Sequence, residues 1–352
     1  MIGIDLFSGA GGMSLGARMA GVDVQQVVEA DKYAAASYLQ NHKPKYGVFV
    51  DDIRKFNPVN FENPNNEELV VFVGPPCQGF STSNQRTRSA TNENNWLFEE
   101  FIRVVNAYRP EWLVFENVKG ILETEGGVFV DQIIEEFEEL GYTISSSILN
   151  ATDYGVPQKR DRFFIVGSLN GVNYQFPKPT HKTPVTVAKA ISDLPILSNG
   201  ASECFVKYSK SATNTYSRLM RGDLKGCHNH LVSRNNKEIL KRYKHIPQGG
   251  NWENIPDRLM SNYADKSRCH TGIYRRLKLD KPSVVIGNYR KNMLIHPTQD
   301  RGLSVREAAR LQSFPDYYFF EGSIGFQQQQ VGNAVPPLLA KAVFEELVKL
   351  ND

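Results

Sequence analysis

The stretch Leu69-Val70-Val71-Phe72-Val73-Gly74-Pro75-Pro76-Cys77-Gln78-Gly79-Phe80-Ser81 combines a strand with the loop that follows it. Its first five residues are all apolar, which predicts a buried strand. Two prolines stiffen the loop, and two glycines leave room for a backbone or a substrate. Cys77 therefore sits at the exit of a strand. This position is typical of a nucleophile, although a cysteine that only packs in the loop fits the same pattern.

Strand-like and helix-like segments alternate in the first half of the chain. The strand-like runs lie near residues 1–7, 24–29, 69–73, 112–116, 142–149 and 163–168. Apolar residues recur at helical spacing over residues 31–41, 96–107 and 128–140. This alternation predicts a doubly wound α/β sheet, in which ligands bind beyond the carboxyl ends of the strands.

The first strand runs into a glycine-rich loop, Asp5-Leu6-Phe7-Ser8-Gly9-Ala10-Gly11-Gly12. Glycines let a ligand approach the backbone where a helix begins. The loop has neither the dinucleotide spacing G-x-G-x-x-G nor the Gly-Lys-Ser/Thr of a phosphate-binding loop. A nucleoside without a phosphate chain fits it better, and glycines needed only for packing are the alternative.

Acidic side chains follow two further strands. An acidic residue at the end of the second strand commonly accepts hydrogen bonds from ribose hydroxyls, which makes Glu29 a candidate for that role. Asp31 is expected to cap the next helix. Asp52 is a candidate acceptor for an adenine amino group, and a plain turn residue is the alternative.

Glu116 follows the apolar run Trp112-Leu113-Val114-Phe115. A carboxylate at the exit of a buried strand is costly unless it is paired or functional. Its functional interpretation is proton exchange with a ring nitrogen. The structural alternative is a salt bridge to Arg160 or Arg162, and the two interpretations are compatible.

The net charge of +3 hides a strong asymmetry. Residues 178–300 carry 22 Lys and Arg against 9 Asp and Glu, whereas the rest of the chain carries 19 against 29. Such a concentrated excess favours a polyanion partner, most simply nucleic acid, over a merely solvated face.

The four cysteines have no paired spacing, so we expect no disulfide framework. Cys227, His228, His230, Cys269 and His270 match no standard zinc spacing, and we expect no metal.

No apolar run is long enough to cross a membrane, and the first residues have no signal-peptide pattern. A soluble, cytoplasmic protein is therefore expected.

After the irregular segment 178–300, helical sequence patterns return. Ser304 and Glu307 form a capping box that opens a helix, and a final helix is expected at about 336–350.

These motifs, in this order, resemble those of the cytosine-C5 DNA methyltransferases of bacterial or phage type. The resemblance covers nearly the whole chain outside 178–300, and Pro-Cys-Gln, Glu-Asn-Val and Gln-x-Arg-x-Arg are its most specific parts. The segment Arg301–Pro315 looks like the family motif that precedes the C-terminal motif. The full series comprises Asp5–Gly12, Glu29-Ala30-Asp31, Asp52-Ile53, Gly74–Ser81, Glu116-Asn117-Val118, Gln158–Arg162 and Gly332-Asn333-Ala334-Val335.

The resemblance implies a Rossmann-like methyltransferase sheet that uses S-adenosylmethionine and releases S-adenosylhomocysteine. It also implies that Cys77 adds to C6 of cytosine, that Glu116 contacts N3, and that Arg162, supported by Arg160, holds O2 and the Glu116 carboxylate. Phe7 would lie against the adenine, and Asn333 would support the cofactor side of the pocket. The expected cofactor-binding residues are Phe7, Ser8, Gly9, Gly11, Gly12, Glu29, Ala30, Asp52, Ile53, Pro75, Asn333 and Ala334.

Chemistry at C5 and C6 requires that the cytosine be flipped out of a DNA duplex. The loop Thr82–Asn95 could close over the flipped base, although a plain mobile loop is the alternative. The family often has a threonine late in its recognition region, but Pro282-Ser283-Val284-Val285-Ile286 has none at the comparable place. The turn that contacts bases therefore cannot be placed by analogy. The candidate DNA-binding residues are Ser81, Arg86, Arg88, Arg234 and Arg290.

We therefore expect a catalytic and cofactor-binding domain over 1–177 and 301–352, with a smaller, irregular target-recognition domain over 178–300. We expect a monomer, because one copy of the protein is enough to flip one base. A cognate restriction endonuclease that acts on the same site is a possible partner. Two other functions remain open. One is a tRNA cytosine-C5 methyltransferase, and the other is a non-enzymatic DNA-binding module with a vestigial pocket. An adenine-amino methyltransferase is disfavoured, because it would carry an acidic residue or Asn before Pro-Pro and an aromatic residue after it.

Overall fold

The computed structural model describes residues 1–58, 61, 63, 65–76, 97–261, 272–287, 289 and 293–351. Its chain divides into two compact units. The first comprises Met1–Tyr154, Asp161–Thr180 and Pro337–Asp352, and the second comprises Gly155–Arg160 and His181–Pro336. The long segment of the second unit, His181–Pro336, begins near residue 178, where we expected a boundary, but it extends past residue 300.

A seven-stranded sheet forms the centre of the first unit, in the order β3-β2-β1-β4-β5-β7-β6. Only β7 runs antiparallel to its neighbours, β5 and β6. The order reverses between β1 and β4, so a crevice is expected beyond their carboxyl ends. The strands are β1 Ile2–Leu6, β2 Asp23–Val28, β3 Val48–Phe49, β4 Leu69–Val73, β5 Trp112–Val118, β6 Thr143–Asn150 and β7 Asp161–Ser168.

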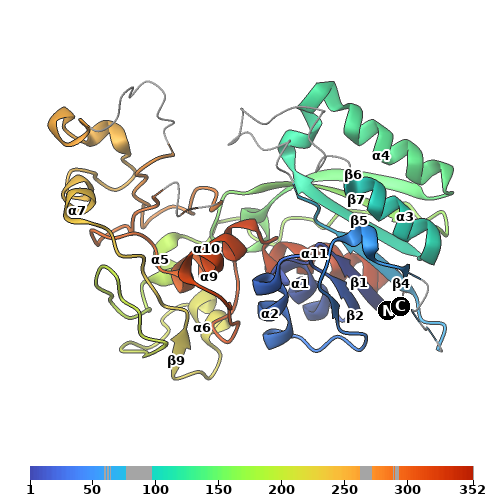
Figure 1. Ribbon diagram of the computed structural model, residues 1–352, viewed down its shortest axis with the longest axis horizontal. Coiled ribbons are helices and arrows are strands. Elements are labelled where there is room, and N and C mark those ends of the chain that lie inside the picture. The colour runs from blue at the N-terminus through green and yellow to red at the C-terminus, as the bar shows by residue number, and fades with distance from the viewer. Residues whose placement is uncertain are drawn as a thin grey trace. The chain divides into compact units, whose positions relative to one another are not determined.

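Helices cover both faces of this sheet, which confirms the predicted doubly wound α/β class (Figure 1). Alternate strand residues such as Leu6, Val71 and Phe115 share one core cluster with residues of α3 and α4. The ring of Phe72 points to the other face and meets Phe344 of α11 at a centroid distance of 5.0 Å. The helices of this unit are α1 Gly12–Met19, α2 Lys32–Asn41, α3 Phe98–Tyr108, α4 Val128–Glu139 and α11 Pro337–Asn351.

Short elements make up the second unit, as expected from its irregular sequence. β8 and β9 pair as a two-stranded antiparallel sheet, with α6 in the connection between them. Helix α9 packs against both α5 and α10. The predicted capping box is confirmed, because Ser304 and Glu307 bond each other's backbone at the start of α9. The elements are α5 Val187–Ile191, β8 Phe205–Lys207, α6 Thr215–Arg221, β9 Gly226–His228, α7 Lys237–Tyr243, α9 Val305–Leu311 and α10 Ile324–Asn333.

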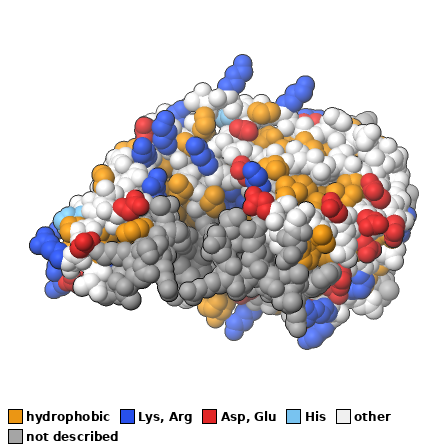
Figure 2. Space-filling model, turned by 90° about the horizontal axis from the view of Figure 1, so that it is seen from above, with side chains coloured by type: hydrophobic (Ala, Val, Ile, Leu, Met, Phe, Trp, Pro, Cys, Tyr) orange, Lys and Arg blue, Asp and Glu red, His pale blue; other side chains and the backbone are white. Residues whose placement is uncertain are grey.

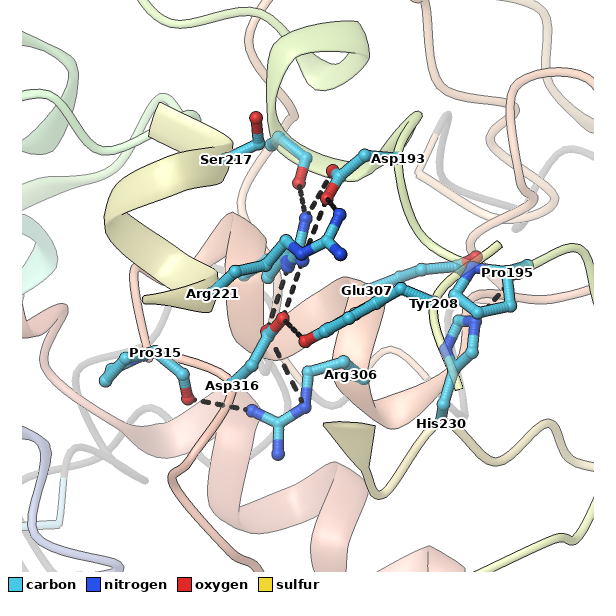
Figure 3. Close-up of polar contacts among 12 residues, drawn as sticks. Asp193, Pro195, Tyr208, Ser217, Arg221, His230, Arg306, Glu307, Pro315 and Asp316 are labelled. Atoms are coloured by element: carbon cyan, nitrogen blue, oxygen red, sulfur yellow. Dashed lines mark hydrogen bonds and ion pairs between the residues drawn. The ribbon is translucent and has the colours of Figure 1, made fainter. Parts of the chain in front are cut away.

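Buried ion pairs hold these short elements together (Figure 3). Arg310 of α9 is fully buried, and its guanidinium contacts Asp193 at 2.5 Å and Asp316 at 2.6 Å. Burial alone would raise the pKa of Asp316, but the hydrogen bonds and charge of Arg310 outweigh it and lower that pKa. Arg221 and Tyr208 complete the cluster, through Asp193 and Asp316 respectively. Arg310 thus joins the chain after α5 to the turn after α9.

His296 gives this unit a predicted acid sensitivity. Its Nδ1 accepts hydrogen bonds from the backbone N–H groups of Thr298 and Gln299, both at 3.2 Å. Burial is the main cause that lowers its pKa from 6.5 to about 4. The unfolded imidazole therefore binds a proton at a higher pH than the folded one, so stability is lost as the pH falls from 6.5 towards 4.

We expect the free energy of unfolding to drop by about 2–3 kcal/mol over that range because of His296. Urea unfolding at pH 7 and pH 4.5 measures the drop, and His296→Asn, which keeps an acceptor but does not titrate, should reduce it. Replacement of the exposed His245 by Asn is the matched control. A drop of equal size in both variants would contradict the assignment.

Candidate active site

The loop between β1 and α1 is held in an unusual conformation. Phe7, Gly9 and Gly11 all have left-handed backbone angles, with φ of 57°, 55° and 86°. The N–H of Ser8 donates to the carbonyl of Val28 at 3.2 Å, which ties the loop to the end of β2. A non-glycine residue in this region is strained, so the surrounding contacts must hold Phe7 there.

Two glycines near this loop serve different purposes. A Cβ added at Gly16 would lie 2.5 Å from the Cβ of Ala340, so Gly16 allows α1 to pack closely on α11. A Cβ added at Gly9 would meet nothing within 4 Å among the described residues. Packing therefore explains Gly16 but not Gly9, whose open side leaves room for a ligand against the backbone.

Glu29 lies directly beside that open side. Its Oε2 accepts from the N–H of Gly9 and its Oε1 from the N–H of Asp31, both at 2.7 Å. Burial is the main cause that raises its pKa, and the two backbone donors oppose the rise. Each carboxylate oxygen keeps a second lone pair, so the group can still accept hydrogen bonds from a ribose. Asp31 caps α2 as predicted, because it accepts from the N–H groups of Tyr33 and Ala34.

Asp52 and Ile53 follow β3 at the same end of the sheet. Asp52 accepts from the backbone N–H of Arg54 at 3.0 Å and also pairs with its guanidinium at 3.4 Å. The structure therefore shows the turn role, and the side chain is still 43% exposed and available to a ligand. Ile53 is buried in the core, and Pro75 is buried just after β4. Ala30 is exposed between Glu29 and Asp31.

Glu116 and Arg162 form a buried ion pair on neighbouring strands. The Nε of Arg162 lies 2.7 Å from Oε1 of Glu116, and each side chain is less than a tenth exposed. Their strands pair so that Glu116 faces Phe164 and Val118 faces Arg162, which makes the two charged residues diagonal neighbours on one face of the sheet. Of the two arginines considered as partners, Arg162 is the one that the structure pairs with Glu116.

Arg160 hydrogen-bonds to backbone groups of the second unit. Its guanidinium donates to the carbonyls of Ile286 at 2.8 Å, Gly332 at 3.1 Å and Ala334 at 3.1 Å. These contacts anchor backbone, so they favour a structural role for Arg160. Asn333 is the last residue of α10, and Ala334 follows it. Their predicted cofactor role stays a prediction.

Several predicted residues lie outside the described part of the chain: Cys77, Ser81, Arg86, Arg88, Cys269, His270 and Arg290. Arg234 is described and lies exposed on a loop, where its side chain covers Gly200. His230 uses both ring nitrogens, one on the hydroxyl of Ser304 at 2.8 Å and one on the carbonyl of Pro195 at 2.9 Å. No cluster of metal-ligating residues occurs in the part of the chain that the structure describes.

The surface of the first unit carries an acidic area. Figure 2 shows the molecule from above, and acidic side chains gather on the part of that surface that α4 forms. Asp131, Glu135, Glu138 and Glu139 are the exposed acidic residues of this helix. These negative side chains repel the negatively charged phosphate backbone, so α4 is an unfavourable surface for nucleic acid.

No described helix is long and apolar enough to cross a membrane.

Sequence reasoning missed a hydrogen-bonded chain of three buried polar residues near the glycine-rich loop. Asp5, Ser14 and Tyr38 are at most 1% exposed and are linked by hydrogen bonds. A signal was present, because an acidic residue inside the otherwise apolar strand Ile2–Leu6 is costly unless it has partners. The identity of those partners depends on α2, which the sequence pattern places in a helix but not against Asp5.

Known proteins resemble this chain along its full length. The family model for C-5 cytosine-specific DNA methylases matches residues 1–349. The Type II methyltransferase M1.HphI of Haemophilus parahaemolyticus is 38% identical, over 99% of this chain and 87% of the relative. The Type II methyltransferase M.DdeI of Desulfomicrobium norvegicum is 34% identical, over 98% and 88%.

Solved structures agree with these relatives. A prophage-encoded protein of E. coli, described as a DNA modification methyltransferase, superposes with a TM-score of 0.81 at 26% identity, over all of both chains. The Dnmt2 methyltransferase of S. pombe has a TM-score of 0.62 at 15% identity, over 100% of this chain and 99% of that one. At this lower identity the second match shows a common fold.

Proposed function

Because this chain belongs to the family of C-5 cytosine-specific DNA methylases, we propose that Cys77 attacks C6 of a flipped cytosine during methyl transfer. The chain is a DNA cytosine-5-methyltransferase, and its family uses S-adenosylmethionine. The observation that carries the proposal is the buried Glu116–Arg162 pair at the end of β5. It supplies an oriented carboxyl and a fixed positive charge where the family's chemistry needs both.

Each residue type suits a definite step. The Cys77 thiolate forms a bond to C6, and a proton from Glu116 to N3 offsets the negative charge that develops on the ring. C5 would then take the methyl group as the bond between that group and the sulfonium sulfur breaks, which would leave S-adenosylhomocysteine. A base such as a water molecule would accept the C5 proton, and the electrons of that C–H bond would re-form the C5–C6 double bond and expel the Cys77 thiolate. The N3 proton would return to Glu116. Arg162 orients Glu116 and would contact O2, because its guanidinium has further donors beyond the one that faces Glu116.

The residues beyond β1, β2 and β3 fit S-adenosylmethionine. Gly9 leaves an open side against the backbone, and the Glu29 carboxylate next to it can accept from ribose hydroxyls. We propose that Phe7 lies against the adenine and that Asp52 accepts from its amino group. The bound cofactor supplies an electrophilic methyl group, and the protein supplies placement and electrostatics.

Methyl transfer from tritiated S-adenosylmethionine to duplex DNA and to tRNA tests the proposal directly. We expect incorporation into duplex DNA, whereas incorporation into tRNA alone would favour the RNA enzyme. Specific DNA binding without any incorporation would favour the non-enzymatic module. Bisulfite sequencing of DNA from cells that express the protein would then identify the modified cytosine.

Glu116→Gln should lower the turnover number by about 10²–10⁴-fold, because the amide cannot supply a proton to N3. Steady-state methyl transfer at saturating DNA and cofactor measures the loss. Glu111→Gln is the matched control, since Glu111 precedes the same strand and accepts from the N–H of Leu69, a bond that an amide oxygen can keep. Turnover of the Glu116 variant within threefold of the unaltered protein would contradict the role.

We also propose that the enzyme acts as a monomer in the cytoplasm beside a restriction endonuclease of the same specificity. The relatives M1.HphI and M.DdeI are named Type II methyltransferases, which supports the endonuclease partner. Resistance of plasmids from expressing cells to endonucleases that cut at the methylated site would support protection. Sedimentation at 39.7 kDa would support the monomer, and a stable dimer would oppose it.

A further inference from the structure

A buried chain of hydrogen bonds lies at the base of the glycine-rich loop. Ser14 of α1 donates from Oγ to Oδ2 of Asp5 at 2.6 Å, and Tyr38 of α2 donates from Oη to Oγ of Ser14 at 2.9 Å. Asp5 is 1% exposed, and the other two residues are fully buried. Burial is the main cause that raises the pKa of Asp5 to about 8, so this carboxyl depends on its neighbours rather than on water.

These hydrogen bonds connect the two ends of the glycine-rich loop, as the positions of the residues along the chain show. Asp5 lies in β1 just before the loop, and Ser14 lies in the first turn of α1 just after it. Their hydrogen bond therefore closes the loop across its base. Tyr38 adds α2, the helix that Asp31 caps beside Glu29. One buried chain thus links the loop after β1 to the helix after β2.

The loop needs such support, because its own conformation is strained. Phe7 has a φ of 57°, which costs about 1–2 kcal/mol for a residue with a side chain. Gly11, the N-cap of α1, has no side chain that could accept hydrogen bonds from the first turn of the helix. A strained backbone persists only where its surroundings enforce it. The Asp5–Ser14 hydrogen bond supplies that constraint at the base of the loop.

His42 holds Tyr38 from the other side. The two rings lie 4.7 Å apart between centroids, and the imidazole also hydrogen-bonds to the backbone of Gly11. Burial, followed by the positive charge of Arg18, lowers the pKa of His42 to about 4, so the ring is neutral at pH 7. Tyr38 is therefore fixed between His42 and Ser14, and both of these residues touch or adjoin the glycine-rich loop.

We propose that Tyr38 and Ser14 are positioning residues for S-adenosylmethionine, which hold the loop Phe7–Gly12 in its binding conformation through Asp5. The inference rests on the proposed cofactor role of that loop. Neither side chain needs to touch the cofactor. Their contribution is that the loop is already ordered before binding, so less conformational freedom is lost on association.

Binding of S-adenosylhomocysteine, measured by isothermal titration calorimetry on the full chain, tests this proposal without methyl transfer. Tyr38→Phe keeps the ring and removes one hydrogen bond, and Ser14→Ala breaks the chain at its centre. We expect each to raise the Kd by about 3–10-fold, the effect of one lost buried hydrogen bond. The double variant should be no weaker than the weaker single variant, because the two groups act in series.

Tyr142→Phe is the matched control. Tyr142 is also buried, and its Oη donates to the carbonyl of Pro110 at 2.8 Å, but it precedes β6 at the far edge of the sheet. This variant should lose similar stability and keep the Kd unchanged. In steady-state assays, Tyr38→Phe should raise the KM for S-adenosylmethionine and change kcat less than twofold.

Three results would overturn the inference. The first is a Kd for folded Tyr38→Phe within twofold of the unaltered protein. The second is an equal loss of affinity in Tyr142→Phe, which would indicate general destabilisation. The third is a fall in kcat with no change in KM. Failure of the unaltered protein to bind S-adenosylhomocysteine would instead remove the proposed function and the inference with it.

Discussion

Replacement of Cys77 by alanine should slow methyl transfer by at least about 10⁴-fold, because no other group in the proposed mechanism can form the bond to C6. Duplex DNA binding should survive, since the phosphate contacts that we expect from the basic segment 178–300 do not depend on a thiol. Single-turnover incorporation of tritiated methyl groups measures the first effect. Fluorescence anisotropy with a labelled duplex measures the second.

Cys204→Ala is the natural control for this experiment. Cys204 is free and exposed in the second unit, so its loss should leave both activity and DNA binding unchanged. The Cys77 variant should also fail to form a covalent complex with DNA that contains 5-fluorocytosine, whose fluorine blocks release of the adduct. Undiminished transfer by Cys77→Ala would refute the assigned role.

Arg310→Met should destabilise the protein by about 3–5 kcal/mol, the largest stability effect that we expect from a single change. The methionine can fill much of the same volume, but it leaves the buried carboxylates of Asp193 and Asp316 without their main partner. An unpaired buried charge costs far more than a lost surface pair. Urea unfolding, followed by hydrogen exchange in α9, measures the loss and locates it in the second unit.

Arg218→Met provides the comparison, because Arg218 lies exposed on α6 and should contribute less than about 1 kcal/mol. High salt should not weaken the Arg310 cluster much, since buried pairs are poorly screened. A loss below 1 kcal/mol in Arg310→Met would show that the cluster is not what holds these short elements together.

The sequence was most informative where local chemistry decides local structure. Apolar runs such as Leu69–Val73 became strands of the sheet at the expected places. The same holds for the capping box of Ser304 and Glu307 and for the Asp31 cap, because each depends on residues within one turn. The motif order also led to the right family, since several specific motifs agreed along one chain.

The second unit was harder to predict for a physical reason. Its core is built partly from arginines, and Arg306 and Arg310 are fully buried although charged residues normally indicate surface. Their partners, such as Asp193, come from distant parts of the sequence, so no local pattern reveals them. For the same reason the Arg162–Glu116 pair could be suggested from the sequence but not chosen over Arg160.

The close contact between Gly16 and Ala340 has a consequence for synthesis of the protein. These residues belong to α1 and α11, which are translated far apart in time although they pack directly against each other. A ribosome adds roughly 5–20 residues per second, so the face of the sheet that α11 covers stays bare for many seconds while the rest of the chain is made. Exposed apolar surface of this kind recruits chaperones or aggregates. A change that delays or removes α11 should therefore lower the yield of soluble protein in cells more than its effect on the mature enzyme would suggest.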